Sequence, residues 1–168
     1  MKNYCRLIVL VLLGYSSITG ARAQLKAGTE GLYIKAGTTL SSDGLVLNPS
    51  ADLTLSSLSI EKSTTPVTGS AGSGINRVYT FSTPATISGT LGFYYLAGEL
   101  NGNTESLLQL AYKSTGAGTT YTATTGSSLN TTTKYVENTF TSTAISTLTA
   151  ADPAIFASTK KELDRQKY

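Results

Sequence analysis

Short runs of alternating apolar and polar residues, separated by turn signals, extend through most of the chain from residue 24 onward. Leu32 and Ile34 begin the pattern, and a period of two is typical of strands with one buried face. Further pairs follow at the same spacing: Leu45 and Leu47, Leu53 and Leu55, Leu58 and Ile60. The phase changes between Leu55 and Leu58, which predicts a bulge or bend in one long strand. These strands fit either a short solenoid-like part or one edge of a sandwich.

Residues 63–76 interrupt the alternation with a segment rich in Gly, Ser and Thr. The glycines from Gly69 to Gly74 superficially resemble a phosphate-binding loop, but the segment contains no Lys and opens no helix. We interpret it as a plain, flexible loop.

The alternation returns after residue 77 with a regular rhythm. Six strands are predicted: 78–82, 89–100, 108–112, 119–125, 133–140 and 144–149. Asn101-Gly102-Asn103 is a hairpin signal, because Asn and Gly tolerate the positive φ angles of tight turns. Turns about every 8–12 residues favour an all-β fold, an antiparallel β-sandwich, over residues 24–150.

The final segment, residues 151–168, changes character. Asp152 can cap a helix that starts at Pro153, and basic residues follow late in the segment. Its apolar stripe is thin, so we expect a short frayed helix or a disordered charged tail in preference to a docked helix.

The first residues have the pattern of an export signal. Lys2 and Arg6 precede the apolar run 7–13, and Ala21-Arg22-Ala23 has the small residues that a signal peptidase accepts. The apolar run is far shorter than the roughly 20 residues of a membrane-spanning helix. We therefore predict a signal peptide at residues 1–23 in preference to a membrane anchor.

Cleavage after residue 23 would change the charge balance. The whole chain has 13 Lys and Arg against 10 Asp and Glu. Since Lys2, Arg6 and Arg22 would leave, the remaining chain would be near neutral, which disfavours nucleic-acid binding. Cys5, the single cysteine, would also leave, so no disulfide is expected.

The residue types argue against catalysis. The chain has no His, which removes the common catalytic triads and the commonest zinc ligand. Glu99 and Glu105 flank the turn at 101–103 and could serve as acid and base in a glycoside hydrolase. A hairpin tip offers little desolvation to raise a carboxyl pKa, so we interpret both as structural. We expect no enzyme activity, catalytic residue, cofactor or metal site.

Aromatic residues gather in the centre of the predicted strands: Tyr79, Phe81, Phe93, Tyr94, Tyr95, Tyr112 and Tyr121. Most of them should be core. Tyr94 and Tyr95 are adjacent, however, and adjacent strand residues point to opposite faces. One of them could stack on a sugar ring. With the polar turn that follows them, the candidate ligand-binding residues are Tyr94, Tyr95, Asn101 and Asn103.

A wider pattern joins several of these motifs: the block 32–60, the ELNG-containing stretch 96–110, Tyr121, Asn130-Thr131-Thr132-Thr133, and the strand 144–148. It resembles modules in large exported surface proteins of the Bacteroidota, many of them cargo of the type IX secretion route. The resemblance implies a β-sandwich-like module of unknown activity that is exported and often surface-associated. It supplies no catalytic residues. The Trp residues common in such modules are missing, and Tyr121 is the nearest substitute.

The combined expectation is a non-enzymatic exported module with a structural or adhesive role at the cell surface. The alternative is a carbohydrate-binding module that uses exposed tyrosines, and a glycoside hydrolase ranks third. The expected partner is a cell-envelope protein or a polysaccharide, with no nucleic acid and no membrane span after cleavage. The location would be extracellular, at the cell surface or in the periplasm.

Overall fold

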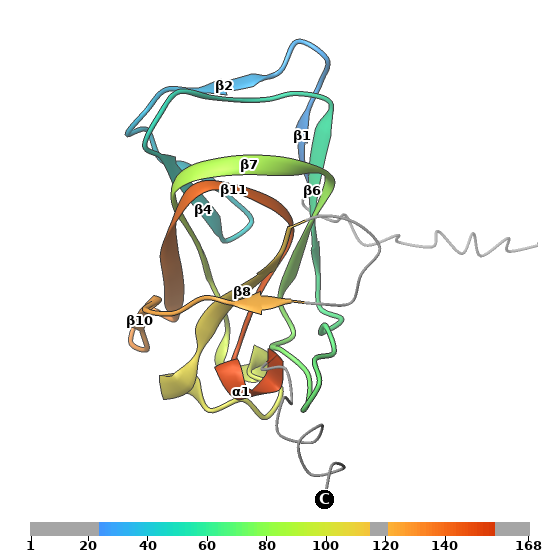
Figure 1. The fold of residues 1–168 in the computed structure, drawn as a ribbon, viewed down its shortest axis with the longest axis vertical. Helices are drawn as coiled ribbons and strands as arrows, with labels where there is room; N and C mark the ends of the chain where they lie inside the picture. The colour runs from blue at the N-terminus through green and yellow to red at the C-terminus, as the bar shows by residue number, and fades with distance from the viewer. Residues whose placement is uncertain (1–23, 115–120, 157–168) are drawn as a thin grey trace, which may run out of the picture.

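The computed structural model describes residues 24–114 and 121–156, where antiparallel strands dominate. Figure 1 shows short strands arranged around two long, curved ones. The strands are β1 (Gln24–Ala27), β2 (Leu32–Ile34), β3 (Leu40–Ser42), β4 (Leu45–Pro49), β5 (Leu53–Leu55), β6 (Leu58–Ser63), β7 (Val78–Tyr94), β8 (Gln109–Lys113), β9 (Thr122–Ala123), β10 (Ser128–Asn130) and β11 (Tyr135–Ala151). The helical turns are η1 (Ala97–Glu99), η2 (Glu105–Leu107) and α1 (Pro153–Phe156). The all-β prediction is confirmed.

The long strands β7 and β11 pair with each other along most of their length, and both are bent. The register of their pairing shifts between Phe140 and Thr143 and again between Ile145 and Thr147. Such bulges bend a strand and increase its twist. Pro84 lies opposite the second shift, where its missing N–H removes no hydrogen bond from the ladder.

The bends divide one sheet into two layers. The first half of β7 pairs with β6 and its second half pairs with β4. In β11, the first half pairs with β10 and the second half with β8. One layer therefore carries β1, β6, β8 and β9, the other carries β3, β4 and β10, and β7 and β11 run through both. The result is a sandwich-like fold, as predicted.

The prediction of separate strands at 78–82 and 89–100, and at 133–140 and 144–149, is wrong in two respects. The members of each pair belong to one strand, β7 or β11, and the predicted breaks are bends within it. In addition, β7 ends at Tyr94, short of residue 100, and η1 follows. The strand continues because its partner bends at the same level, so backbone hydrogen bonds resume on the far side. The predicted strand 119–125 is reduced to β9 within the described residues.

The N-terminal block forms nested antiparallel pairs. β1 pairs with β6, β3 pairs with β4, and β2 and β5 form a separate two-stranded sheet. These ladders extend the sandwich; of the two expected arrangements, this is the one observed. Leu55 and Leu58 do not share one bent strand, however. Ser57, with φ +50°, separates β5 from β6, and the two strands belong to different sheets.

Two turns contain consecutive residues with positive φ. Asp43 (+47°) and Gly44 (+85°) close the tight hairpin between β3 and β4. Asn101 (+49°) and Gly102 (+79°) form the predicted turn, but η1 precedes it where the strand 89–100 was expected, and η2 follows it in place of a direct hairpin. The flanking backbone satisfies its hydrogen bonds locally: Glu99 N–H donates to the Leu96 carbonyl at 2.9 Å, in the manner of a 3₁₀ turn.

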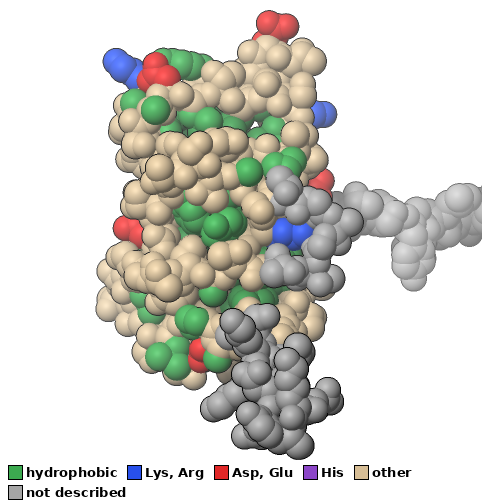
Figure 2. Space-filling model, viewed as in Figure 1, with side chains coloured by type: hydrophobic (Ala, Val, Ile, Leu, Met, Phe, Trp, Pro, Cys, Tyr) green, Lys and Arg blue, Asp and Glu red, His purple; other side chains and the backbone are tan. Residues whose placement is uncertain are grey.

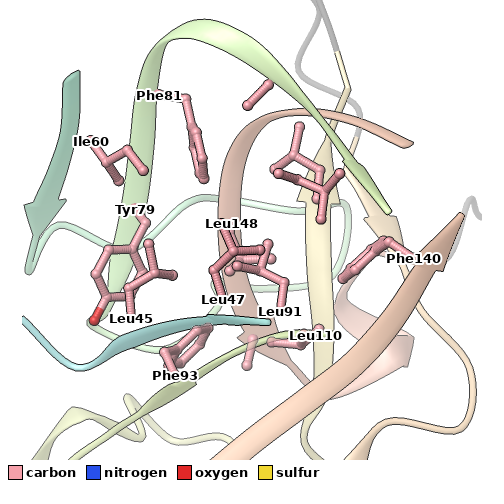
Figure 3. Packing of buried hydrophobic residues seen from close by; sticks show 14 of the residues in the cluster. Leu45, Leu47, Ile60, Tyr79, Phe81, Leu91, Phe93, Leu110, Phe140 and Leu148 are labelled. Atoms are coloured by element: carbon pink, nitrogen blue, oxygen red, sulfur yellow. The ribbon is translucent and has the colours of Figure 1, made fainter. Parts of the chain in front are cut away.

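The core lies between the two layers. Figure 3 shows Leu47, Leu91, Leu110 and Leu148 gathered there. Aromatic rings fill the rest of the space, with 5.5 Å between the ring centroids of Tyr79 and Phe93. The largest fully buried side chains are Tyr79, Tyr95, Phe93, Ile75, Ile87, Leu91, Leu108, Leu110, Ile145, Leu148, Val136 and Thr149. Most of the predicted aromatic cluster is therefore core, as expected.

The segment after β11 docks on the loop at 64–77. Asp152 caps α1 as predicted, because its Oδ1 accepts a hydrogen bond from Ala154 N–H at 3.0 Å. The Ile155 carbonyl accepts one from Ala71 N–H at 3.2 Å. A Cβ at Gly69 would lie 2.3 Å from that carbonyl oxygen, so glycine permits the close approach. The predicted short C-terminal helix is confirmed by α1, but its described part is docked, where we expected it to be frayed. The signal segment and residues 157–168 lie outside the described residues.

Candidate binding face and the paired carboxylates

At the end of β7 the adjacent tyrosines point in opposite directions, as predicted: Tyr94 is the last residue of the strand and Tyr95 follows it. The Tyr94 side chain is 47% exposed, whereas Tyr95 is 2% exposed and belongs to the core. The Tyr95 hydroxyl donates a hydrogen bond to Glu105 Oε1 at 2.8 Å. Burial and this bond to a carboxylate raise the pKa of Tyr95 far above its ordinary value. Tyr95 is thus an internal anchor, and Tyr94 faces solvent.

The two glutamates that flank the turn are held by different cations. Glu105 also accepts a hydrogen bond from Lys134 Nζ at 2.7 Å, and Lys134 and Tyr95 together lower its pKa. A general acid needs a raised pKa, whereas the pKa of Glu105 is lowered, which does not suit that role. Lys134 lies in the turn before β11, with φ +57°, and its side chain reaches Glu105 at the start of η2.

Glu99 belongs to a buried network. Its carboxylate accepts two parallel hydrogen bonds from Arg77, Nε to Oε2 at 2.7 Å and Nη2 to Oε1 at 2.9 Å. Oε2 also accepts the backbone N–H of Leu96 at 2.8 Å. The third arm of Arg77 donates to the Tyr79 hydroxyl, which in turn donates to the Asp43 carbonyl. Through Arg77 and Tyr79, Glu99 therefore links η1 to the β3–β4 hairpin.

The two candidate asparagines also act within the fold. Asn101 donates its amide to the Gly74 carbonyl at 2.9 Å. Asn103 is 8% exposed. Its amide donates to the carbonyls of Ser73 and Leu100, and its oxygen accepts the backbone N–H of Asp152 at 3.1 Å. Asn103 thus joins the 64–77 loop, the η1–η2 turn and the start of α1. Of the four candidate ligand residues, Tyr94 and Asn101 are exposed, and Asn101 is held by its hydrogen bond to the 64–77 loop.

The partner of Tyr94, Tyr135, was not among the residues predicted from the sequence. Tyr135 begins β11 and is the cross-strand neighbour of Tyr94, with ring centroids 4.7 Å apart and an interplanar angle of 41°. Its hydroxyl donates to Glu137 Oε2 at 2.9 Å. A Cβ at Gly92 would lie 2.8 Å from that hydroxyl, so the glycine makes room for the ring to lie across the sheet. The register of β7 against β11 creates this pair.

The outward side of the layer around this pair is partly open to solvent: Tyr94 and Thr139 are exposed, Gly92 is buried, and the other outward positions are half-buried. Leu91, Phe93 and Val136 point into the core, so alternate positions point outward. We call the following set the tyrosine face: Val46, Asn48, Thr90, Gly92, Tyr94, Tyr135, Glu137 and Thr139. Asn48 donates to Thr39 at 3.1 Å, and the hydroxyls of Thr90 and Thr139 are 3.5 Å apart. Glu137 is the single charged member of this set.

The wider surface has a similar character. On the side of the molecule drawn in Figure 2, charged side chains are few and scattered. Within residues 24–114 and 121–156, no three His, Cys, Asp or Glu side chains meet in a group that could hold a metal ion. No helix in the same residues has the length and hydropathy needed to cross a membrane.

The topology defines the class of protein: an all-β chain with an antiparallel, sandwich-like fold built on two shared strands. Comparison with protein-family models, with curated proteins and with solved structures finds no match to this chain. Function is therefore inferred from the fold and from the tyrosine face.

Proposed function

We propose that this protein is a non-enzymatic, exported module that acts in structure or adhesion at the cell surface. The observation that carries the proposal is the tyrosine face, where a half-exposed ring lies beside polar side chains on the outside of the sandwich. The signal-like pattern of residues 1–23 supports export. The capture of Glu99 and Glu105 by structural cations supports a role that is not catalytic.

The position of the face on strands also supports a binding role. Tyr94 and Tyr135 lie on the long ladder between β7 and β11, whose opposite side is packed core. Side chains on regular elements are held more precisely than side chains on loops. Such a face presents a fixed set of contacts, as a structural or adhesive surface requires.

The proposal is tested by locating the protein and measuring its attachment. Intact producing cells are treated with a protease that cannot enter them, and the protein is followed by immunoblot. We expect it to be digested on intact cells. Beads coated with the purified protein should also retain envelope fragments from the same cells more strongly than beads coated with unrelated protein. Protection from the protease together with no retention of envelope would overturn the proposal.

A further inference from the structure

We propose that the tyrosine face binds a neutral polysaccharide, with Tyr94 as the stacking platform. This inference rests on the proposed surface-binding function and names the chemistry of its partner. The apolar faces of sugar rings stack on aromatic rings, and tyrosine adds a polar tip that can hydrogen-bond to a sugar hydroxyl.

Tyr94 has the exposure and the support that a platform needs. Its side chain is 47% exposed, and the ring of Tyr135 lies 4.7 Å away. Tyr135 is itself fixed, because its hydroxyl is bound by Glu137 and passes close to Gly92. A ring that is already held in place loses little conformational freedom when a ligand binds, which favours affinity.

The rest of the face offers hydrogen bonds along the same strands. Thr90 and Thr139 form a cross-strand pair four positions from Tyr94 and Tyr135, respectively. At about 3.3 Å per strand residue, this pair lies roughly 13 Å from the tyrosine pair. Asn48 lies beside Thr90 on the neighbouring strand. The face is therefore longer than one sugar ring, and its hydroxyls and amide match the hydroxyl groups of a polymer.

Charge decides which polymer the face suits. The set contains no Lys or Arg, and its one carboxylate, on Glu137, already accepts the Tyr135 hydroxyl. Lys134, next to Tyr135 in sequence, is paired with Glu105 at 2.7 Å. Anionic polymers would therefore meet no free cation in this set. Its aliphatic surface is limited to half-buried Val46, so an apolar protein surface would find little to cover. A neutral glycan fits best.

The test is a pull-down of the purified protein on insoluble cellulose, chitin and β-1,3-glucan, with alginate gel as the anionic comparison. We expect saturable binding to at least one neutral polymer. Tyr94→Ala should weaken it by about tenfold or more, because burial of one aromatic ring is lost. Tyr94→Phe keeps the ring and should retain most of the binding.

Tyr33→Ala is the matched control. Tyr33 is a tyrosine on a strand and is 60% exposed, as Tyr94 is 47% exposed, but it lies on β2 in the separate two-stranded sheet. Its loss should leave binding unchanged. Thermal unfolding of each variant confirms that the fold is retained.

Equal binding by the wild-type protein and Tyr94→Ala, binding to alginate alone, or no binding to any polymer would overturn the inference. The bead experiment separates this failure from failure of the proposed function. If coated beads still retain envelope fragments, the surface role stands and its partner is of another kind.

Discussion

The two ends of the sandwich differ in how they are held. Figure 1 shows the β2–β5 sheet at one end and the η1, η2 and α1 turns at the other. The β2–β5 end is made of regular strands, but leucines and the exposed Tyr33–Asp52 pair hold it, and an open groove of about 390 Å³ separates it from the bend in β7. The turn-rich end is irregular, yet Arg77, Asn103 and Thr149 are buried there and hydrogen-bonded. At these two ends, therefore, the irregular end has the buried polar side chains that are hydrogen-bonded across segments.

The largest loss in the free energy of unfolding is expected from a substitution at Arg77, in the turn-rich end. Arg77→Met removes the cation and leaves Glu99 in a site with 14% side-chain exposure. Breaking a buried pair on one side costs about 3–5 kcal/mol, and urea unfolding should show a loss of that order. Lys62→Met is the control, because the Lys62–Asp43 pair is more exposed and should cost about 1 kcal/mol or less. Equal losses would mean that burial of the Arg77 pair has no special weight.

A smaller effect is expected at Asn103. Asn103→Ala leaves the carbonyls of Ser73 and Leu100 and the N–H of Asp152 without this partner. We expect a loss of about 2 kcal/mol, together with faster proteolysis within the 64–77 loop. Asn48→Ala removes a single exposed hydrogen bond to Thr39 and should change stability by about 0.5 kcal/mol or less. Unchanged proteolysis in Asn103→Ala would show that this side chain does not hold the loop.

The smallest effect on stability is expected at the β2–β5 end, from Asp52, and it depends on pH. Hydrogen bonds from Ala36 N–H and the Tyr33 hydroxyl lower the pKa of Asp52. Since the folded pKa lies below the unfolded value, the carboxylate stabilises the fold above about pH 4, and the contribution disappears as the pH falls through the folded pKa. Wild type and Asp52→Ala should therefore differ in urea unfolding at pH 7 and converge at strongly acidic pH. A difference that persists there would contradict this account.

These contrasts also separate what sequence could predict from what it could not. The Asp43-Gly44 and Asn101-Gly102 turns and the opposite orientations of Tyr94 and Tyr95 depend on neighbouring residues, so they were predictable. Glu99 was recognised as structural, but its partner Arg77 was not identified. That pair depends on how distant segments meet in space, which no local pattern records.

The binding face was predicted only in part for the same reason. Tyr94 was found from its own strand, whereas Tyr135 joins the site through the register between β7 and β11. Asn103 was a candidate ligand residue as part of the predicted turn that follows the two tyrosines. Instead, the 64–77 loop and α1 cover it and use its amide. Three-dimensional covering of a turn is invisible in a single sequence.

The bends in β7 and β11 have a further consequence for how the molecule comes apart. Since both strands pass through both layers, neither layer can detach while the other stays intact. Because the two shared strands connect the layers through continuous backbone and hydrogen bonds, the two layers should unfold together in one cooperative transition. The pairing of β7 with β11 also joins segments that are distant in sequence. Such long-range pairing makes folding slow, on the scale of milliseconds to about seconds.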